Sequence, residues 1–402
     1  MRLCALRALS ASVLLMAVPS LADDSETHWR VFVADQADGG VTALDLDAPE
    51  NRWQFELAGP ARLYPSQSGA ALLAVQSDND QVSVFNSGIS LDSHGDHADI
   101  AVSEPEQIDG ALEGARPFHV VSHGPEMSIN FDAGGYVLTL EESDLLEGRL
   151  DGTSFEQNTA HHGFAVPIKD YVISSVAAEP EDDAEVLPPR VGLAAFSPDG
   201  EMIGDLHTCT DLHGEAFSGS YLVAGCAEGI AALDTSGSEP VMQMLAYPDD
   251  LPAAKTGTLL GSKAMQVFLG NYGADALVVI DPAEEPHLRH IALPYRSVDF
   301  ILDPAKPQFG YVLTEDGTLH RINLLTASIE DSAGVSEPYS MDGHWRDPRP
   351  RLAIAGGDVL MTDPLNNAVK VIDAETLAVS RSIEVEGLPY NIAVVGGSGL
   401  TH

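Results

Sequence analysis

Three histidines stand at corresponding places in three successive repeats of the chain. His119, His162 and His213 occur in Pro-Phe-His-Val-Val, Ala-His-His-Gly-Phe and Asp-Leu-His-Gly-Glu, each in or just ahead of a short strand-like run. A repeat that returns one side chain to the same position can direct several copies of it toward a common axis. Zinc favours such imidazoles as ligands, in tetrahedral geometry with about 2.0–2.1 Å to each nitrogen. The spacing therefore predicts a zinc site.

A closed zinc site needs a fourth ligand. We expect His161, which is adjacent to His162, and keep Asp211 or a residue of a nearby loop as alternatives. His344, in Asp-Gly-His-Trp-Arg, is a reserve ligand. The competing interpretation is that these side chains line a water-filled channel without binding metal.

A second group of possible metal ligands lies in the segment 92–109, which is polar, acidic and predicted to be an extended loop. Its stretch Asp-Ser-His-Gly-Asp-His-Ala-Asp contains His94 and His97 together with three aspartates. Imidazoles and carboxylates on a glycine-containing loop suit a flexible cation site. Because the segment precedes His119, we expect it to reach the predicted channel. The alternative is an ordinary solvated loop.

The first 22 residues have the pattern of a secretory signal. Arg2 and Arg7 precede an apolar stretch, and Ser20-Leu-Ala22 places small residues at the cleavage positions. The apolar stretch is too short for a membrane anchor, so we expect no membrane insertion and a mature protein of residues 23–402 in the periplasm.

Cleavage of the signal removes Cys4 and leaves two cysteines. In an oxidising compartment Cys209 and Cys226 are expected to form a disulfide that constrains the segment presenting His213. The alternative is that Cys209 is a thiolate ligand, because it lies near His207 and His213.

The charge balance argues against two classes of partner. The chain has 20 Lys and Arg against 61 Asp and Glu, a formal net charge of −41. Such a field repels nucleic acid and anionic lipid, and it raises the local concentration of cations.

The elements that must position these residues are short strands. Glycine and proline are frequent, helical periodicity is missing, and hairpins recur, as in 71–85, 311–322 and 359–373. Innermost strands are expected near residues 63, 117, 161, 213, 256, 298, 340 and 388. These spacings, about 42 to 54 residues, are typical of propeller blades. We predict an all-β fold, a single β-propeller with eight blades and seven as the alternative. The N-terminal strands, which pair with the C-terminal strand, complete the last blade.

Alignment of the innermost strands gives the side chains a common register. Asn391 falls on His119, and Asp299 is a weaker match. The three histidines then belong to the second, third and fourth blades, which are neighbours, so their imidazoles are expected to meet at the channel.

Enzyme signatures are few. The sequence contains no Gly-x-Ser-x-Gly elbow, no Walker loop and no His-Glu-x-x-His helix. Glu215 is a possible general base for a zinc-bound water, so a metal-dependent hydrolase or lactonase using the same channel is the alternative function. A third possibility is a binding scaffold without metal.

The chain resembles the AztD-type periplasmic zinc metallochaperones. The resemblance rests on the signal peptide, the propeller, the acidic histidine-containing loop and several short phrases. These phrases are Ala-His-His-Gly at 160–163, His-Thr-Cys-Thr-Asp-Leu-His-Gly-Glu at 207–215 and Met-Asp-Gly-His-Trp-Arg-Asp-Pro-Arg-Pro-Arg at 341–351.

The resemblance implies a protein that binds Zn²⁺ in the periplasm and delivers it to the solute-binding protein of an ABC zinc importer. We expect the chain to be a monomer that binds the ion without turnover. Carried over by position, His119, His162 and His213 form the tight site. His94 and His97 form the auxiliary site.

Overall fold

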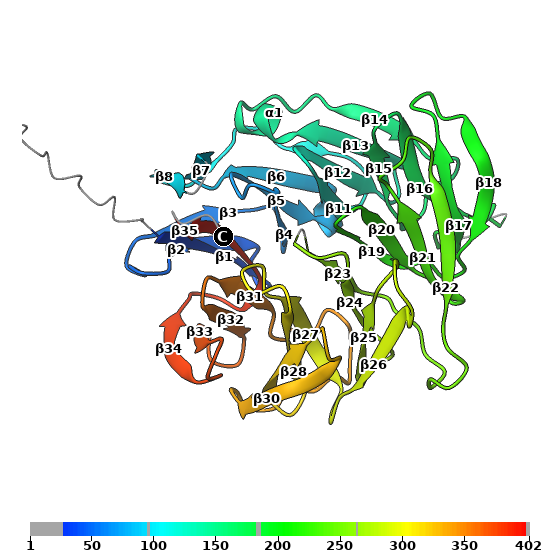
Figure 1. The fold of residues 1–402 in the computed structure, drawn as a ribbon. Helices are drawn as coiled ribbons and strands as arrows, with labels where there is room; N and C mark the ends of the chain where they lie inside the picture. The colour runs from blue at the N-terminus through cyan, green and yellow to red at the C-terminus, as the bar shows by residue number, and fades with distance from the viewer. Residues whose placement is uncertain (1–26, 95–96, 182–185, 263, 399–402) are drawn as a thin grey trace, which may run out of the picture.

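The strands of this chain are arranged as blades around a central axis. A computed structural model describes residues 27–94, 97–181, 186–262 and 264–398, so the predicted signal peptide, 1–22, lies outside the described residues. Within the described residues the strands form eight sheets of four or five strands and one separate two-stranded hairpin. Figure 1 shows the sheets around a common centre. The predicted eight-bladed propeller is confirmed, and seven blades are excluded.

The blades are numbered here by their innermost strands in chain order. Blades 1 to 4 are β4 (Arg62–Pro65), β5 (Ala71–Gln76), β6 (Gln81–Asn86), β9 (Glu106–Gln107) and β10 (Leu112–Glu113); β11 (Pro117–His123), β12 (Glu126–Phe131), β13 (Tyr136–Glu141) and β14 (Thr153–Glu156); β15 (Ala165–Ile168), β16 (Tyr171–Ala177), β17 (Arg190–Phe196) and β18 (Met202–Thr208); and β19 (His213–Ser218), β20 (Tyr221–Gly225), β21 (Gly229–Asp234) and β22 (Val241–Ala246).

Blades 5 to 8 are β23 (Leu259–Gly261), β24 (Phe268–Asn271), β25 (Ala276–Ile280) and β26 (Leu288–Ala292); β27 (Ser297–Leu302), β28 (Phe309–Thr314), β29 (Thr318–Asn323) and β30 (Ser328–Gly334); β31 (Leu352–Ala355), β32 (Asp358–Asp363), β33 (Ala368–Asp373) and β34 (Val379–Glu384); and β35 (Pro389–Ser398), β1 (Thr27–Asp35), β2 (Gly40–Asp45) and β3 (Arg52–Glu56).

Blade 8 is built from both ends of the chain, as predicted. Its innermost strand, β35, pairs antiparallel with β1, and Phe32 lies opposite Ala393 in the register. Phe32 then packs with Leu63 and Phe85 of blade 1 in one buried apolar cluster. This pairing joins the two ends of the chain in one blade and closes the ring (Figure 1).

The burial pattern explains the sequence of the strands. Every residue of β5 and of β25 is buried, because the inner strands of a blade are covered by the neighbouring blades on both faces. Every residue of the outermost strand β18 is exposed. A strand covered on both faces is apolar along its whole length, whereas an outer strand tolerates polar residues. The described helical segments are α1 (Glu142–Leu146) and the 3-10 turn η1 (Ser77–Asn79), and no described helix is long and apolar enough to cross a membrane.

The innermost strand predicted near residue 340 was placed wrongly. The innermost strand of blade 7 is β31, which begins at Leu352, and a long loop connects it to β30. The buried side chain of Arg349 organises this loop, donating hydrogen bonds to the carbonyls of Ser340, Asp342 and His344. These carbonyls accept hydrogen bonds from a guanidinium and not from a neighbouring strand, so the segment does not join a sheet.

The segment 92–109 is not an extended loop as predicted. It contributes β7 (Ile89–His94) and β8 (His97–Val102), which pair as a hairpin, as well as β9. Ile89 and Ile100 pack into the cluster between blades 8 and 1, and this apolar anchoring holds the hairpin as a sheet. The hairpin contacts the far end of β35, where Leu91 lies beside Gly397.

Candidate metal centre

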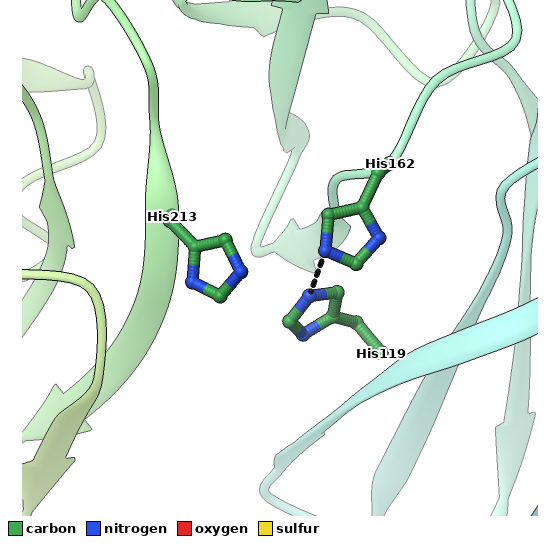
Figure 2. A group of neighbouring side chains, drawn as sticks. All are labelled: His119, His162 and His213. Atoms are coloured by element: carbon green, nitrogen blue, oxygen red, sulfur yellow. Dashed lines mark hydrogen bonds between the residues drawn. The ribbon is translucent and has the colours of Figure 1, made fainter. Parts of the chain in front are cut away.

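His119, His162 and His213 come together at the entrance of the central channel. Nε2 of His119 lies 3.2 Å from Nε2 of His162, and one nitrogen of each of the three rings lies within 4.8 Å of the others. Figure 2 shows the three rings turned toward one another, with His213 on β19 facing the other two. The repeat register thus predicted the convergence of these residues correctly.

The local backbone explains how the rings reach the same point. β11 and β19 each have an irregular register in their first residues, between Pro117 and Val120 and between His213 and Glu215. Such bulges re-aim a side chain relative to its strand. In β19 the bulge contains Gly214, whose φ is +75°, and a Cβ there would lie 2.6 Å from the carbonyl oxygen of Gly257. Glycine at this position permits the close approach of β19 to blade 5.

The second nitrogen of each ring faces a different oxygen acceptor. Nδ1 of His162 donates to Oδ2 of Asp132 at 2.7 Å, and Nδ1 of His213 donates to the carbonyl of Gly257 at 2.6 Å. Nδ1 of His119 lies 3.5 Å from Oε1 of Glu215. A proton on Nδ1 leaves the lone pair on Nε2 free. This is how outer-shell acceptors orient metal-binding imidazoles in proteins.

Asp132 is a functional residue that the sequence analysis missed. Its side chain is fully buried, it accepts a hydrogen bond from Asn130 at 2.7 Å, and its backbone N–H donates to the carbonyl of Arg116. The residue directly follows β12, in Phe-Asp-Ala-Gly-Gly, which has the composition of an ordinary turn. The one usable signal was a carboxylate directly after a strand of the blade that carries His119.

The electrostatic environment differs among the three rings. Burial and the positive charge of neighbouring imidazoles hold the pKa of His162 and that of His213 below their usual value, although Asp132 and the Gly257 carbonyl oppose the shift. For His119, burial works in the same direction, but the carboxylates of Glu215 and Asp132 outweigh it and raise the pKa. On protonation of the metal-free site, His119 therefore takes up a proton first.

The structure does not place His161, the predicted fourth ligand, among the converging histidines. The side chain is fully buried; its Nδ1 is bonded to the carbonyl of Thr159 and its Nε2 to the hydroxyl of Ser175, both at 2.7 Å. Both ring nitrogens are therefore used within blade 3. The alternative ligand Asp211 is exposed and pairs with Lys255 at 3.3 Å.

His94 and His97 lie opposite each other in the register of the β7–β8 hairpin. This hairpin contacts β35 at Gly397, about 20 Å along the strand from Asn391. Asn391 is bonded to Leu63 of β4, and the next residue, Tyr64, is bonded to the carbonyl of Phe118, so Asn391 lies at the same end of the propeller as His119. The structure therefore does not bring this pair to the three histidines, contrary to the expectation that the segment reaches the channel. His344 is exposed on the loop between β30 and β31, where its Nδ1 accepts a hydrogen bond from the backbone of Arg346.

The disulfide between Cys209 and Cys226 is confirmed. Both residues are fully buried, and their Cα atoms lie 4.9 Å apart. Cys209 precedes β19, and Cys226 directly follows Gly225, which lies opposite His213 in the β19–β20 register. The crosslink therefore constrains both strands next to His213, and Cys209 is not available as a thiolate ligand.

The three histidines open onto a cavity of about 800 Å³. A tetrahedral zinc ion places its ligand nitrogens about 3.3–3.4 Å apart, which is close to the 3.2 Å between His119 and His162. The ligand nitrogen of His213 lies within 4.8 Å of those of His119 and His162, so His213 would move toward the ion to bind it. Three neutral imidazoles would hold the ion from the protein side and leave a fourth position for a ligand from the cavity.

Glu215 is not placed as a general base for a metal-bound water. Its carboxylate faces Nδ1 of His119, on the side of the ring away from the converging Nε2 atoms. Its contact orients an imidazole, which is the role that Asp132 has for His162.

Comparison with known proteins gives two levels of similarity. No protein-family model matches the chain. The zinc chaperone AztD of Citrobacter koseri is 40% identical over 388 residues, which cover 96% of this chain and 91% of the relative. The crystal structure of C. koseri AztD matches with a TM-score of 0.88 over 94% of this chain and 100% of that chain, and the structure of apo AztD matches with a TM-score of 0.87 at 38% identity.

More distant structures show the fold alone. A putative 6-phosphogluconolactonase from Bacteroides uniformis is 15% identical with a TM-score of 0.52, covering 92% of this chain and 100% of that chain. At this identity the lactonase name carries no argument about activity, and the relative at 40% identity is named a chaperone. The chain therefore belongs to the family of the zinc chaperone AztD.

Proposed function

We propose that this chain is a periplasmic zinc metallochaperone without enzymatic turnover. It binds one Zn²⁺ through Nε2 of His119, His162 and His213, and it delivers the ion to the solute-binding protein of an ABC zinc importer. The observation that carries the proposal is the convergence of three imidazoles, two of which donate a hydrogen bond through Nδ1 to an oxygen acceptor, while Nδ1 of the third lies 3.5 Å from a carboxylate. The buried disulfide suits an oxidising compartment such as the periplasm.

The open fourth position supports carriage of zinc in preference to permanent storage. A structural zinc site is closed by four protein ligands. Here three ligands converge beneath a cavity, so a donor group of a second protein can bind the ion before the histidines release it. Transfer would then proceed by ligand exchange in a transient complex of this monomer with its acceptor.

The test is the zinc content of the purified protein. Wild-type chain is expected to retain about one zinc per molecule after dialysis, and the His119→Ala/His213→Ala variant is expected to retain none. A control variant, His207→Ala/His290→Ala, removes two histidines outside the cluster and should keep the metal. Undiminished zinc in the first variant would refute the assignment.

A further inference from the structure

The cavity above the three histidines has a basic and apolar wall. The described residues that line it beside the histidines are Arg62, Arg116, Phe118, Ala133, Val186, Leu187 and Trp345. Two of them are arginines and none is a carboxylate, although the whole chain has 61 acidic residues against 20 basic ones. The described lining residues are therefore basic, within a chain that is strongly acidic as a whole.

Arg62 lies where its charge does not help to hold a cation. Its guanidinium lies over the ring of Phe118 at 4.7 Å and over the ring of Trp345 at 5.6 Å. Phe118 is the neighbour of His119 and packs edge-on against His162 at 4.6 Å. No carboxylate of the described residues forms an ion pair with Arg62. A fixed positive charge beside a zinc site repels the ion, so zinc binding does not explain this residue.

Arg116 is held at the rim by its backbone. Its φ is 56°, in the left-handed region that a residue with a side chain disfavours. The backbone N–H donates to Oδ1 of Asp80 at 2.7 Å, and the carbonyl accepts from the N–H of Asp132 at 2.9 Å. These two bonds fix an exposed arginine next to the residue that orients His162.

Trp345 supplies an exposed aromatic surface beside these charges. It is 50% exposed, and the guanidinium of Arg346 lies over its ring at 4.8 Å. Arg346 in turn pairs with Asp78 of blade 1, which fixes the loop between β30 and β31 across the entrance. Val186, which also lines the cavity, is 79% exposed. Tryptophan and arginine are the residues that contribute most to binding at protein interfaces.

We propose that this entrance is the docking surface for the zinc acceptor, and that the acceptor presents an acidic segment to it. The inference rests on the proposed function. Carboxylates of the segment would pair with Arg62 and Arg116 while its apolar part packs on Trp345. An acidic protein is repelled by the rest of this chain, so the arginines favour the orientation that brings a donor group of the acceptor to the open zinc position.

The experiment measures zinc transfer to a defined acceptor. Zinc-loaded chain is mixed with the metal-free zinc solute-binding protein of the same organism, and the two proteins are separated at timed intervals for metal analysis. The test variant is Arg62→Gln/Arg116→Gln. Arg52→Gln/Arg289→Gln is the matched control, because it removes the same charge from outer strands of blades 8 and 5. Arg116→Gln alone is the second test variant, since Arg62 packs near His119.

The expected result is transfer about ten-fold slower in the test variant at low ionic strength, with zinc content unchanged. The difference should shrink as salt is added, and the control should match wild type. Arg116→Gln alone should show part of the effect. Equal rates of zinc transfer in the test and control variants, whether unchanged or slowed alike, would refute the docking proposal. The proposed function would still stand. A wild-type chain that transfers no zinc would overturn the proposed function, and this inference with it.

Discussion

Nδ1 of His162 donates a 2.7 Å hydrogen bond to Oδ2 of Asp132, a carboxylate with no exposed surface. Asp132 directly follows β12 of blade 2, whereas His162 lies on the segment that leads into blade 3. The bond therefore joins two blades and fixes which nitrogen of His162 faces the other histidines.

Replacement of this carboxylate should weaken zinc binding. In Asp132→Asn the neutral amide keeps the shape but accepts the Nδ1 proton less strongly, so Nε2 becomes a poorer donor. Zinc affinity, measured by competition with a chelating dye, should fall about 10- to 100-fold. Asp151→Asn, an exposed aspartate on the same blade, serves as the control and should leave the affinity unchanged. Equal affinities in the two variants would remove Asp132 from the site.

The affinity for zinc should also depend on pH through His119. Glu215 and Asp132 raise the pKa of His119, whereas burial and mutual repulsion lower those of His162 and His213. As the pH falls, His119 is therefore protonated first, and a protonated nitrogen cannot bind zinc. Affinity measured from about pH 8 to pH 5.5 should stay level and then fall below the pKa of His119.

Glu215→Gln should move that fall to lower pH, because the variant lacks the charge that raises the pKa of His119. Glu113→Gln, an exposed glutamate, should reproduce the wild-type profile. A profile of Glu215→Gln that coincides with wild type would show that the carboxylate does not control the titration.

The sequence predicted the ring but not the contacts between blades. The spacing of the repeats and the pattern of short strands identified eight blades. The alignment of Asn391 with His119 identified the end of the channel where the histidines meet. Both inferences follow from repetition along the chain. Asn391 indeed contacts the neighbouring blade at the entrance, where it accepts a hydrogen bond from the N–H of Leu63. His161 and His162 are indistinguishable by spacing. Only the folded blade shows that Ser175 uses one nitrogen of His161, while Asp132, 30 residues from His162, turns that ring toward the site.

This difference between adjacent histidines can be tested by stability and metal content together. His161→Ala leaves the buried hydroxyl of Ser175 and the carbonyl of Thr159 without their shared partner, which should cost about 1–3 kcal/mol in the free energy of unfolding. The folded variant should still hold one zinc. His119→Ala should give the reverse pattern, an almost unchanged stability without zinc. Chemical denaturation and metal analysis of both variants would check this, and loss of zinc from folded His161→Ala would restore that residue as a ligand.

The disulfide should support both the fold and the site. Cys209→Ser/Cys226→Ser should lower the free energy of unfolding by about 2–4 kcal/mol, because the unfolded chain regains freedom. Zinc affinity should fall as well, since the crosslinked segments flank His213. Denaturation and dye competition measure the two effects, and reduction of the wild-type protein should reproduce them. Unchanged zinc affinity in the folded variant would show that the crosslink acts on stability alone.

The most direct test of the account is the position of the ion itself. Crystals of the zinc-loaded chain, measured at the zinc absorption edge, should give one strong anomalous peak at the channel entrance. The peak should lie about 2.0–2.1 Å from Nε2 of His119, His162 and His213, with the fourth position facing the cavity. A peak bound through Nδ1 atoms, a peak elsewhere in the molecule, or no peak at these histidines would contradict the account.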